Sequence, residues 1–282
     1  QTLVGSYFLG TNESAVVSAH NNEAAVCATG SGTAQTNPLC PNGTQIDSFF
    51  SATNYVGAFA PGSDEDNNWA AGWTTGLFTP PECPSGTVET GSIEGKKVCT
   101  LNGTYTTDVT LQRGNYYALD GKIQIGNDMG SDGTKAGGAS ATLTIEAGVT
   151  VFGDSGSDYL VVMRGSKINA IGTKSAPIIM TARADVMGQV TSSSRGLWGG
   201  LVILGKAQLN KCSFVNSVRT LPCERVVEGS AGDYMGGEIN DDNSGTLKYL
   251  RVQYAGYEIF EGNELNGITF GGVGTGTTVE YI

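Results

Sequence analysis

Short apolar runs, separated by turns rich in Gly, Asn and Asp, recur along the chain from about residue 101 onward. Runs of this length between turn residues predict β-strands rather than helices. The segments are "ATLTIEAGVTVFG" (141–153), "DYLVVMRGSKINAIG" (158–172), "APIIMTA" (176–182), "LWGGLVILG" (197–205), "LKYLRVQYAG" (247–256), "NGITFGG" (266–272) and "TTVEYI" (277–282). The first two segments each predict two strands around a turn.

The spacing of these strands predicts how they stack. Apolar residues that we take as equivalent, such as Leu143, Leu160, Ile178 and Leu201, recur about every 20 residues. A repeat of this length made only of strands favours a solenoid over a sandwich. Runs such as "YLVVM" and "LVIL" are continuously apolar, as strands of parallel sheets tend to be. The sequence therefore predicts an all-β chain that forms a right-handed parallel β-helix over residues 101–282.

Two regions depart from this strand pattern. Residues 1–100 are irregular, contain stretches such as "GTAQTNPLCPNGT" and hold four of the six cysteines. They predict a loop-rich, disulfide-containing N-terminal domain that caps the β-helix. The interval from Leu204 to Leu247 lacks a clear strand repeat and contains two further cysteines. It predicts a loop inserted at one edge of the β-helix.

The cysteines indicate the redox compartment. They fall in three pairs that are close in sequence: Cys27 with Cys40, Cys83 with Cys99, and Cys212 with Cys223. No C-x-x-C motif is present and the chain has one histidine, so it offers few of the ligands that a zinc site needs. Three disulfides are the better interpretation, each worth roughly 3 kcal/mol in the chain-entropy description. Disulfides persist in oxidising compartments, so we expect a secreted, extracellular or cell-surface protein.

The charge and the hydropathy of the chain exclude several classes of binding partner. Sixteen Lys and Arg against 27 Asp and Glu give a net charge of −11 and a pI near 4.5. Such a surface repels nucleic acid and anionic lipid. No apolar run is long enough to span a membrane. The start at Gln1, without a methionine, is typical of a processed secreted chain.

Several longer segments are similar to those of known proteins. "RGLWGGLVILGKA" (195–207), "VVEGSAGDYMGGEINDDNSGTLKYLRVQYAG" (226–256) and "NELNGITFGGVGTGTTVEYI" (263–282) resemble a family of secreted or surface-attached bacterial proteins with a right-handed parallel β-helix. The resemblance covers about residues 48–282. It implies a bacterial cell-surface protein or lipoprotein, carries over no catalytic residues, and implies further coils beyond the last segment.

Acidic loops offer oxygen ligands to a hard cation. "SDEDNN" (63–68), "NDMGSDG" (127–133), "GDSGSD" (153–158) and "EINDDNSG" (238–245) are such loops. Calcium binds six to eight oxygens, several of them from carboxylates. We expect that no cofactor is required, with Asp233, Asp241 and Asp242 as the first candidates for a Ca²⁺ site. The alternative is that these loops are solvated acidic turns.

A polysaccharide-active protein is the alternative to a structural one. Parallel β-helices include polysaccharide lyases and glycoside hydrolases, although a fold alone does not establish a function. The candidate bases are Arg164, Lys167, Arg183 and Arg251, the candidate carboxylates are Asp154 and Asp241, and the candidate sugar-stacking rings are Tyr254, Tyr257 and Phe260.

"GDSGS" (153–157) resembles a protease motif around Ser155, but a triad would need His20, so a turn is the better interpretation. The sequence favours a protein without enzymatic activity over an enzyme.

The two ends of the chain suggest self-assembly. A β-helix exposes unpaired backbone groups at each end, and solenoids need caps there. Open ends either bind another subunit head to tail, which builds a filament, or are covered by coils outside this sequence. The candidate assembly residues are Leu3, Val4, Tyr7, Phe8, Val279, Tyr281 and Ile282. The sequence therefore predicts a structural or adhesive β-helix protein that self-assembles into a fibre, with carbohydrate binding as the alternative.

Overall fold

A computed structural model of the chain describes residues 80–282, apart from 213, 216–217, 220–221, 231 and 261–262. Of the predicted N-terminal domain (1–100), residues 1–79 lie outside the described residues. The division of the chain at residue 100 stays a prediction. The strand β2 (Lys96–Tyr105) runs across that position and pairs in parallel with β4 (Tyr116–Ile125).

Parallel strands form three faces, each of which we name after its last strand. The β16 face contains the first halves of β2 and β4, then β6 (Thr150–Gly153), β9 (Ile178–Ala182) and β16 (Leu250–Val252). The β19 face contains the second halves of β2 and β4, then β7 (Tyr159–Val162), β10 (Gly200–Leu204) and β19 (Ile268–Gly271). The β20 face contains β3 (Val109–Leu111), β5 (Thr142–Ile145), β8 (Lys167–Ile171), β15 (Gly245–Lys248) and β20 (Thr278–Glu280).

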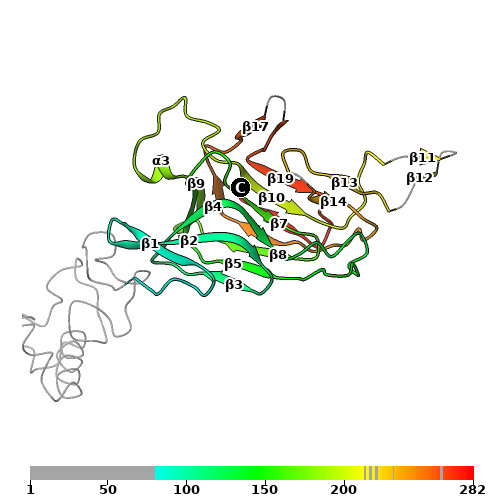
Figure 1. The fold of residues 1–282 in the computed structure, drawn as a ribbon, viewed down its shortest axis with the longest axis horizontal. Coiled ribbons are helices and arrows are strands. Elements are labelled where there is room, and N and C mark those ends of the chain that lie inside the picture. The colour runs from blue at the N-terminus through cyan, green and yellow to red at the C-terminus, as the bar shows by residue number, and fades with distance from the viewer. Residues whose placement is uncertain (1–79, 213, 216–217, 220–221, 231, 261–262) are drawn as a thin grey trace, which may run out of the picture. The chain divides into compact units, whose positions relative to one another are not determined.

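The chain visits the three faces in turn and so winds into coils. Figure 1 shows β4, β7, β10 and β19 side by side, in agreement with their pairing. Strand β4 belongs to two faces because it bends at Gly121, whose φ of 75° lies in the left-handed region that glycine adopts without strain. The prediction of a parallel β-helix is confirmed.

The strand pairing within that β-helix differs from the pairing that we predicted from the spacing of apolar residues. Leu143, Leu160 and Ile178 lie on β5, β7 and β9, which belong to three different faces. Within the β19 face, Leu160 pairs with Leu201, and Leu201 pairs with Ile268. The repeat of about 20 residues was therefore wrong as a coil length, because it related strands of different faces.

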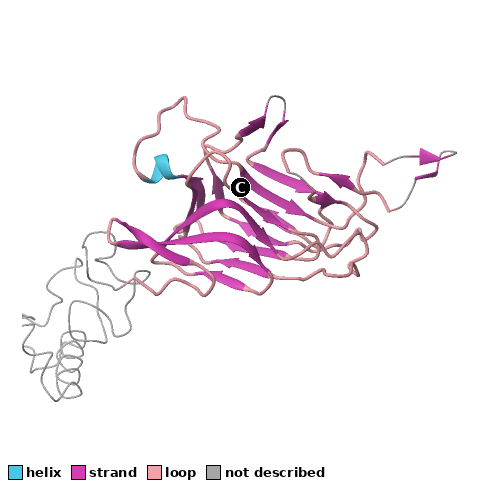
Figure 2. Ribbon diagram, viewed as in Figure 1, coloured by secondary structure: helices cyan, strands magenta, loops and turns pink. Residues whose placement is uncertain are grey.

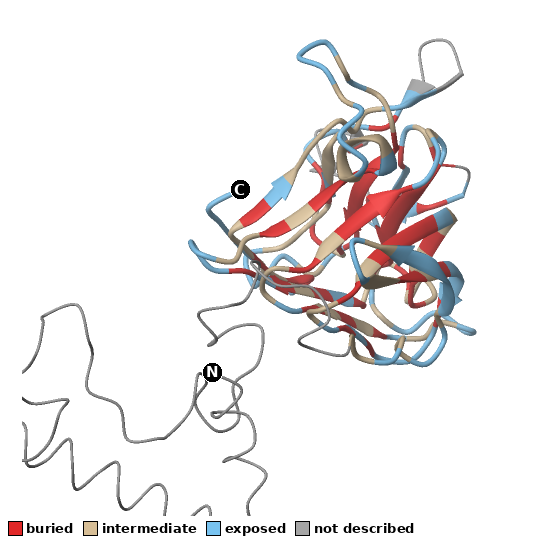
Figure 3. Cartoon of the chain, turned by 90° about the vertical axis from the view of Figure 1, so that its left-hand side faces the viewer, coloured by how far each residue is buried: buried red, intermediate tan, exposed pale blue. Residues whose placement is uncertain are grey.

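Continuous apolar strands arise because some strands are covered on both sides. In β7 and β10, Leu160, Val162, Leu201 and Ile203 point into the main core. The alternate residues Val161, Val202 and Leu204 pack in a second cluster with Val227 and Leu265, from segments that cover the sheet outside. Figure 3 shows buried residues along the strands and exposed residues on the loops around them. Each fully buried aliphatic side chain contributes roughly 1.5–3 kcal/mol.

The elements outside the three faces are short. Apart from β1 (Val88–Ile93), they are the helix α3 (Arg183–Val186) and the antiparallel pairs β11 (Phe214–Val215) with β12 (Val218–Arg219), β13 (Arg225–Val226) with β14 (Tyr234–Met235), and β17 (Glu258–Phe260) with β18 (Asn263–Glu264). Figure 2 shows how little helix the described residues contain. In the described residues no helix is long and apolar enough to cross a membrane.

Two of the three predicted disulfides are present in the described residues. Cys83 bonds to Cys99, next to the antiparallel pair of β1 (Val88–Ile93) with β2. Cys212 bonds to Cys223 and closes the segment that holds β11 and β12, between β10 and β15. The pair Cys27 and Cys40 lies outside the described residues.

Candidate functional site

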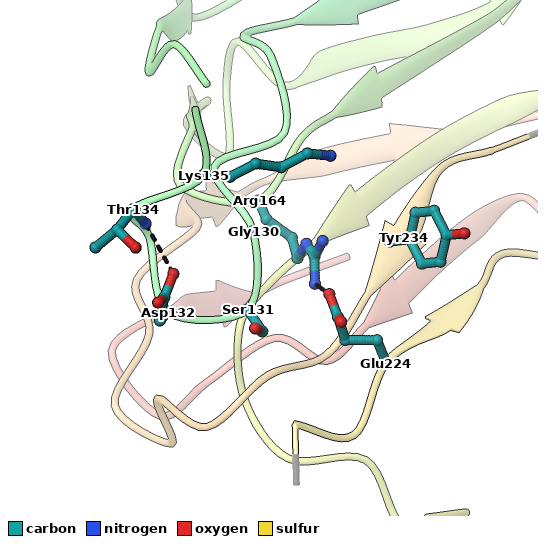
Figure 4. Close-up of a pocket in the computed structure, with 8 residues that line it drawn as sticks. All are labelled: Gly130, Ser131, Asp132, Thr134, Lys135, Arg164, Glu224 and Tyr234. Carbon is teal, nitrogen blue, oxygen red and sulfur yellow. Dashed lines mark hydrogen bonds and ion pairs between the residues drawn. The ribbon is translucent and has the colours of Figure 1, made fainter. Parts of the chain in front are cut away.

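A polar cleft of about 460 Å³ opens beside the β19 face, where loops from three parts of the chain meet. Its volume lies within the usual range for small-molecule sites. One wall is the loop after β4, the floor is the turn after β7, and the other wall belongs to the inserted segment between β10 and β15. The lining residues, drawn in Figure 4, are Gly130, Ser131, Asp132, Thr134, Lys135, Arg164, Glu224 and Tyr234.

Arg164 holds the three parts together. Its side chain is 2 % exposed and forms a two-pronged ion pair with Asp128, from Nε to Oδ1 at 2.6 Å and from Nη2 to Oδ2 at 2.7 Å. Its Nη1 donates to Glu224 Oε1 at 2.5 Å and to the carbonyl oxygen of Gly236 at 2.7 Å. A buried guanidinium needs such partners, and its fork matches a carboxylate. Arg164 therefore fixes both walls of the cleft.

The walls are placed by local structure. Asn127 and Ala139 form an antiparallel bridge that closes the loop after β4. The backbone amide of Met129 donates to the carbonyl oxygen of Arg164 at 3.1 Å, which seats the loop on the turn after β7. On the opposite wall, Glu224 follows directly after the disulfide-bonded Cys223.

The ring of Tyr234 is the aromatic surface of the cleft. Tyr234 lies in β14 and is 42 % exposed. The guanidinium carbon of Arg164 lies 5.9 Å from the centre of its ring, at the limit of a cation–π contact. In Figure 4 the ring stands beside Arg164 and opposite the loop that carries Lys135. The cleft therefore combines one exposed aromatic face with hydroxyl, ammonium and carboxylate groups.

The protonation states in the cleft follow from these contacts. Burial alone would raise the pKa of Asp128, but hydrogen bonds from Arg164 and Lys135 outweigh it and hold this pKa at about 2. Burial alone would lower the pKa of Arg164, but its bonds to Asp128 and Glu224 outweigh it and raise this pKa. The backbone amide of Thr134 donates to Asp132 and lowers the pKa of that carboxyl. Asp128 and Asp132 are thus ionised at neutral pH, and Arg164 is protonated.

The three aspartates predicted for calcium are engaged differently. Asp233 is buried and accepts from Lys122 Nζ at 2.6 Å and from the hydroxyl of Ser230. Asp242 is buried and accepts from the hydroxyl of Ser244, and it lies 3.5 Å from Lys206 Nζ. Asp241 is exposed. Among the described residues no group of three or more acidic, His or Cys side chains is placed to hold a metal ion. Calcium binding stays a prediction.

Of the predicted bases, Arg164 is the one that lines the cleft. Arg183 pairs with Asp154 and lies over the ring of Phe152. Lys167 and Arg251 are exposed on β8 and β16. Tyr254 and Tyr257 are outside the cleft lining. Ser155 lies in the turn between β6 and β7, where its hydroxyl donates to Asp158, and His20 lies outside the described residues.

The predicted assembly residues at the C-terminal side lie on or after β20. Val279, Tyr281 and Ile282 are 44 %, 65 % and 54 % exposed. The ring of Tyr281 stacks on that of Tyr249, with centres 4.5 Å apart. Leu3, Val4, Tyr7 and Phe8 lie outside the described residues.

The sequence did not single out Asp128, Lys135, Glu224 or Tyr234 as residues of one site. Two signals pointed toward part of it. The acidic loop 127–133 contains Asp128 and Asp132, and "YLVVMRG" places Arg164 directly after a buried strand, where an arginine needs a partner.

One comparison with known proteins gives a match. The family model described as a pectate-lyase-like β-helix domain matches residues 103–282. No curated protein and no solved structure matches the chain. The matched segment contains the cleft and all three parallel faces from the end of β2 onward. The chain belongs to the pectate-lyase-like β-helix domain family.

Proposed function

We propose that this domain binds an extracellular polysaccharide in the cleft over Arg164 and does not cleave it. The observation that carries the proposal is the exposed ring of Tyr234, which faces a cleft lined by hydroxyl and carboxylate groups. A sugar ring packs its C–H face on an aromatic side chain and directs its hydroxyls to polar groups at the sides. Membership of a pectate-lyase-like family supports a polysaccharide as the ligand, and the two disulfides support an oxidising, extracellular location.

The protonation states of Asp128, Asp132 and Arg164 argue against these three groups as the general acid or base of a cleavage reaction. A glycoside hydrolase uses a protonated carboxyl as general acid, and a lyase uses an unprotonated base. The lowered pKa values of Asp128 and Asp132 leave both carboxyls ionised at neutral pH. The raised pKa of Arg164 keeps its guanidinium protonated. These three groups are suited to hold the cleft in shape and to accept hydrogen bonds.

Replacing Tyr234 with alanine is expected to weaken glycan binding roughly tenfold, through loss of the stacking surface. Binding is measured by calorimetry against a panel of neutral, amino and uronic-acid oligosaccharides. Tyr257→Ala is the matched control, because Tyr257 is an exposed tyrosine outside the cleft. Equal losses in the two variants, or a panel in which nothing binds, would contradict the proposal. Thermal unfolding of each variant shows that the fold is retained.

A structural, adhesive role by self-association is the second candidate function. Within the described residues, β16, β19 and β20 each pair with a single neighbouring strand. Phe270 and Val279, on β19 and β20, are each 44 % exposed. A second copy of this chain that added its strands to these edges head to tail would build a fibre.

This second candidate predicts association that depends on concentration. Sedimentation velocity of the 282-residue chain should show larger species as concentration rises. Val279→Lys should abolish them, because a charged side chain at an open edge opposes strand addition. A single monomer boundary at every concentration would rule the candidate out. Lys167→Ala, on the inner strand β8, serves as the control substitution.

A further inference from the structure

The cationic groups of the cleft are already paired within the protein. Arg164 is almost fully buried, and its guanidinium contacts Asp128, Glu224 and a backbone carbonyl oxygen. Four of its five N–H donors are used in these bonds. Lys135 Nζ lies 2.9 Å from Asp128 Oδ2. Arg164 therefore has no two donors left for the two-pronged ion pair by which proteins usually bind a sugar carboxylate. Lys135 is 53 % exposed, but as a point charge it cannot form that pair, and its charge is partly offset by Asp128.

Two carboxylates, in contrast, remain open to the cleft. Glu224 is 32 % exposed, and its Oε1 accepts from Arg164. Asp132 is exposed and its Oδ1 accepts from the Thr134 amide. A carboxylate has about four acceptor positions, so each can accept further hydrogen bonds from a ligand. The chain as a whole carries a net charge of −11, and this charge adds to the negative potential of the two carboxylates in the cleft.

We infer that the cleft selects glycans with uncharged or positively charged units, amino sugars most strongly, and discriminates against polyuronates. This inference rests on the proposed function and names its ligand class. An ammonium group on a sugar adds an attraction to Asp132 and Glu224 that a neutral hydroxyl lacks. A uronate meets these two carboxylates with like charge, and the cations nearby, Arg164, Lys135 and Lys206, already lie against carboxylates of the protein.

Three oligosaccharides of equal length test the inference: a glucosamine oligomer, a cello-oligomer and an oligogalacturonate. Binding is measured by calorimetry at about pH 5, where the side-chain carboxyls are mostly ionised and the sugar amines are protonated. The expected order of affinity is the glucosamine oligomer first, the cello-oligomer second and the oligogalacturonate last. Added salt should weaken only the binding of the glucosamine oligomer markedly.

Asp132→Asn isolates the charge from the shape of the cleft. Asparagine keeps a side-chain oxygen for the Thr134 amide and removes only the charge. The preference for the glucosamine oligomer over the cello-oligomer should fall roughly two- to fivefold, as for an exposed ion pair. Asp241→Asn, at an exposed aspartate outside the cleft, is the matched control and should leave the preference unchanged.

The possible outcomes test the charge selectivity separately from the proposed glycan binding. Tightest binding of the oligogalacturonate, or equal binding of all three, overturns the charge selectivity but keeps the proposed glycan-binding function, provided that Tyr234→Ala weakens it. An unchanged preference in Asp132→Asn also overturns the selectivity. Absence of binding by all three probes overturns the proposed function and the inference together.

Discussion

Arg164→Ala is expected to lower the free energy of unfolding by roughly 3–5 kcal/mol. The substitution removes one partner of a buried pair and leaves the carboxylate of Asp128, which is 9 % exposed, without its main counter-charge. It also leaves the carbonyl oxygen of Gly236 without this donor. Urea unfolding at pH 7, followed by circular dichroism, measures the loss.

Two further variants show where that loss comes from. Arg251→Ala, at an exposed arginine on β16, should change stability by less than about 0.5 kcal/mol. Adding Asp128→Asn to Arg164→Ala should recover part of the loss, because the unpaired buried charge is then removed. A loss below about 1 kcal/mol in Arg164→Ala would show that the buried pair does not hold the walls of the cleft.

The same pair gives the wild-type protein an acid-sensitive component of stability. The folded-state pKa of Asp128, about 2, lies below its ordinary value of 3.8. A carboxyl shifted downward stabilises the fold fully above its unfolded pKa and loses that contribution as pH falls through its folded pKa. For Asp128 the contribution is about 2 kcal/mol, lost between about pH 4 and about pH 2. Arg164→Ala should therefore differ from wild type much less at pH 2 than at pH 7.

The strands could be predicted from sequence because each is a short apolar run between turn residues. "YLVVM" and "LVIL" correspond to β7 and β10, whose residues are buried throughout. The register could not be predicted, because strands of all three faces look alike in sequence. The partner of Leu201 in the next coil is Ile268, and the inserted segment that lies between them hides any fixed repeat.

The sequence allowed only separate parts of the candidate site to be recognised. The loop 127–133 could be recognised as acidic, and Arg164 could be recognised as a cation directly after a buried strand. Their pairing joins residues 36 positions apart, and the bond to Glu224 joins residues 60 apart. The inserted segment that brings Glu224 and Tyr234 to the cleft has no strand pattern of its own. Only the three-dimensional winding places these groups together.

Trp198→Ala is expected to lower the free energy of unfolding by roughly 3–5 kcal/mol through the cavity that it leaves in the main core. Trp198 is fully buried just before β10, and its Nε1 donates to the carbonyl oxygen of Gln253 at 2.7 Å. Its Cβ lies so close to Gly153 that any side chain at that glycine would collide with it. The tryptophan thus fits against the adjacent coil and ties β10 to the segment after β16. Chemical denaturation measures the loss.

Trp198→Phe separates the two contributions of this residue. Phenylalanine retains much of the ring volume but has no donor for the carbonyl oxygen of Gln253, so the loss should be smaller, roughly 1–3 kcal/mol. Val226→Ala, at an exposed apolar residue on β13, should lie within about 0.5 kcal/mol of wild type. Each coil of a solenoid is stabilised mainly by its neighbours. A loss in Trp198→Ala no larger than that in Val226→Ala would therefore mean that adjacent coils here do not depend on this contact.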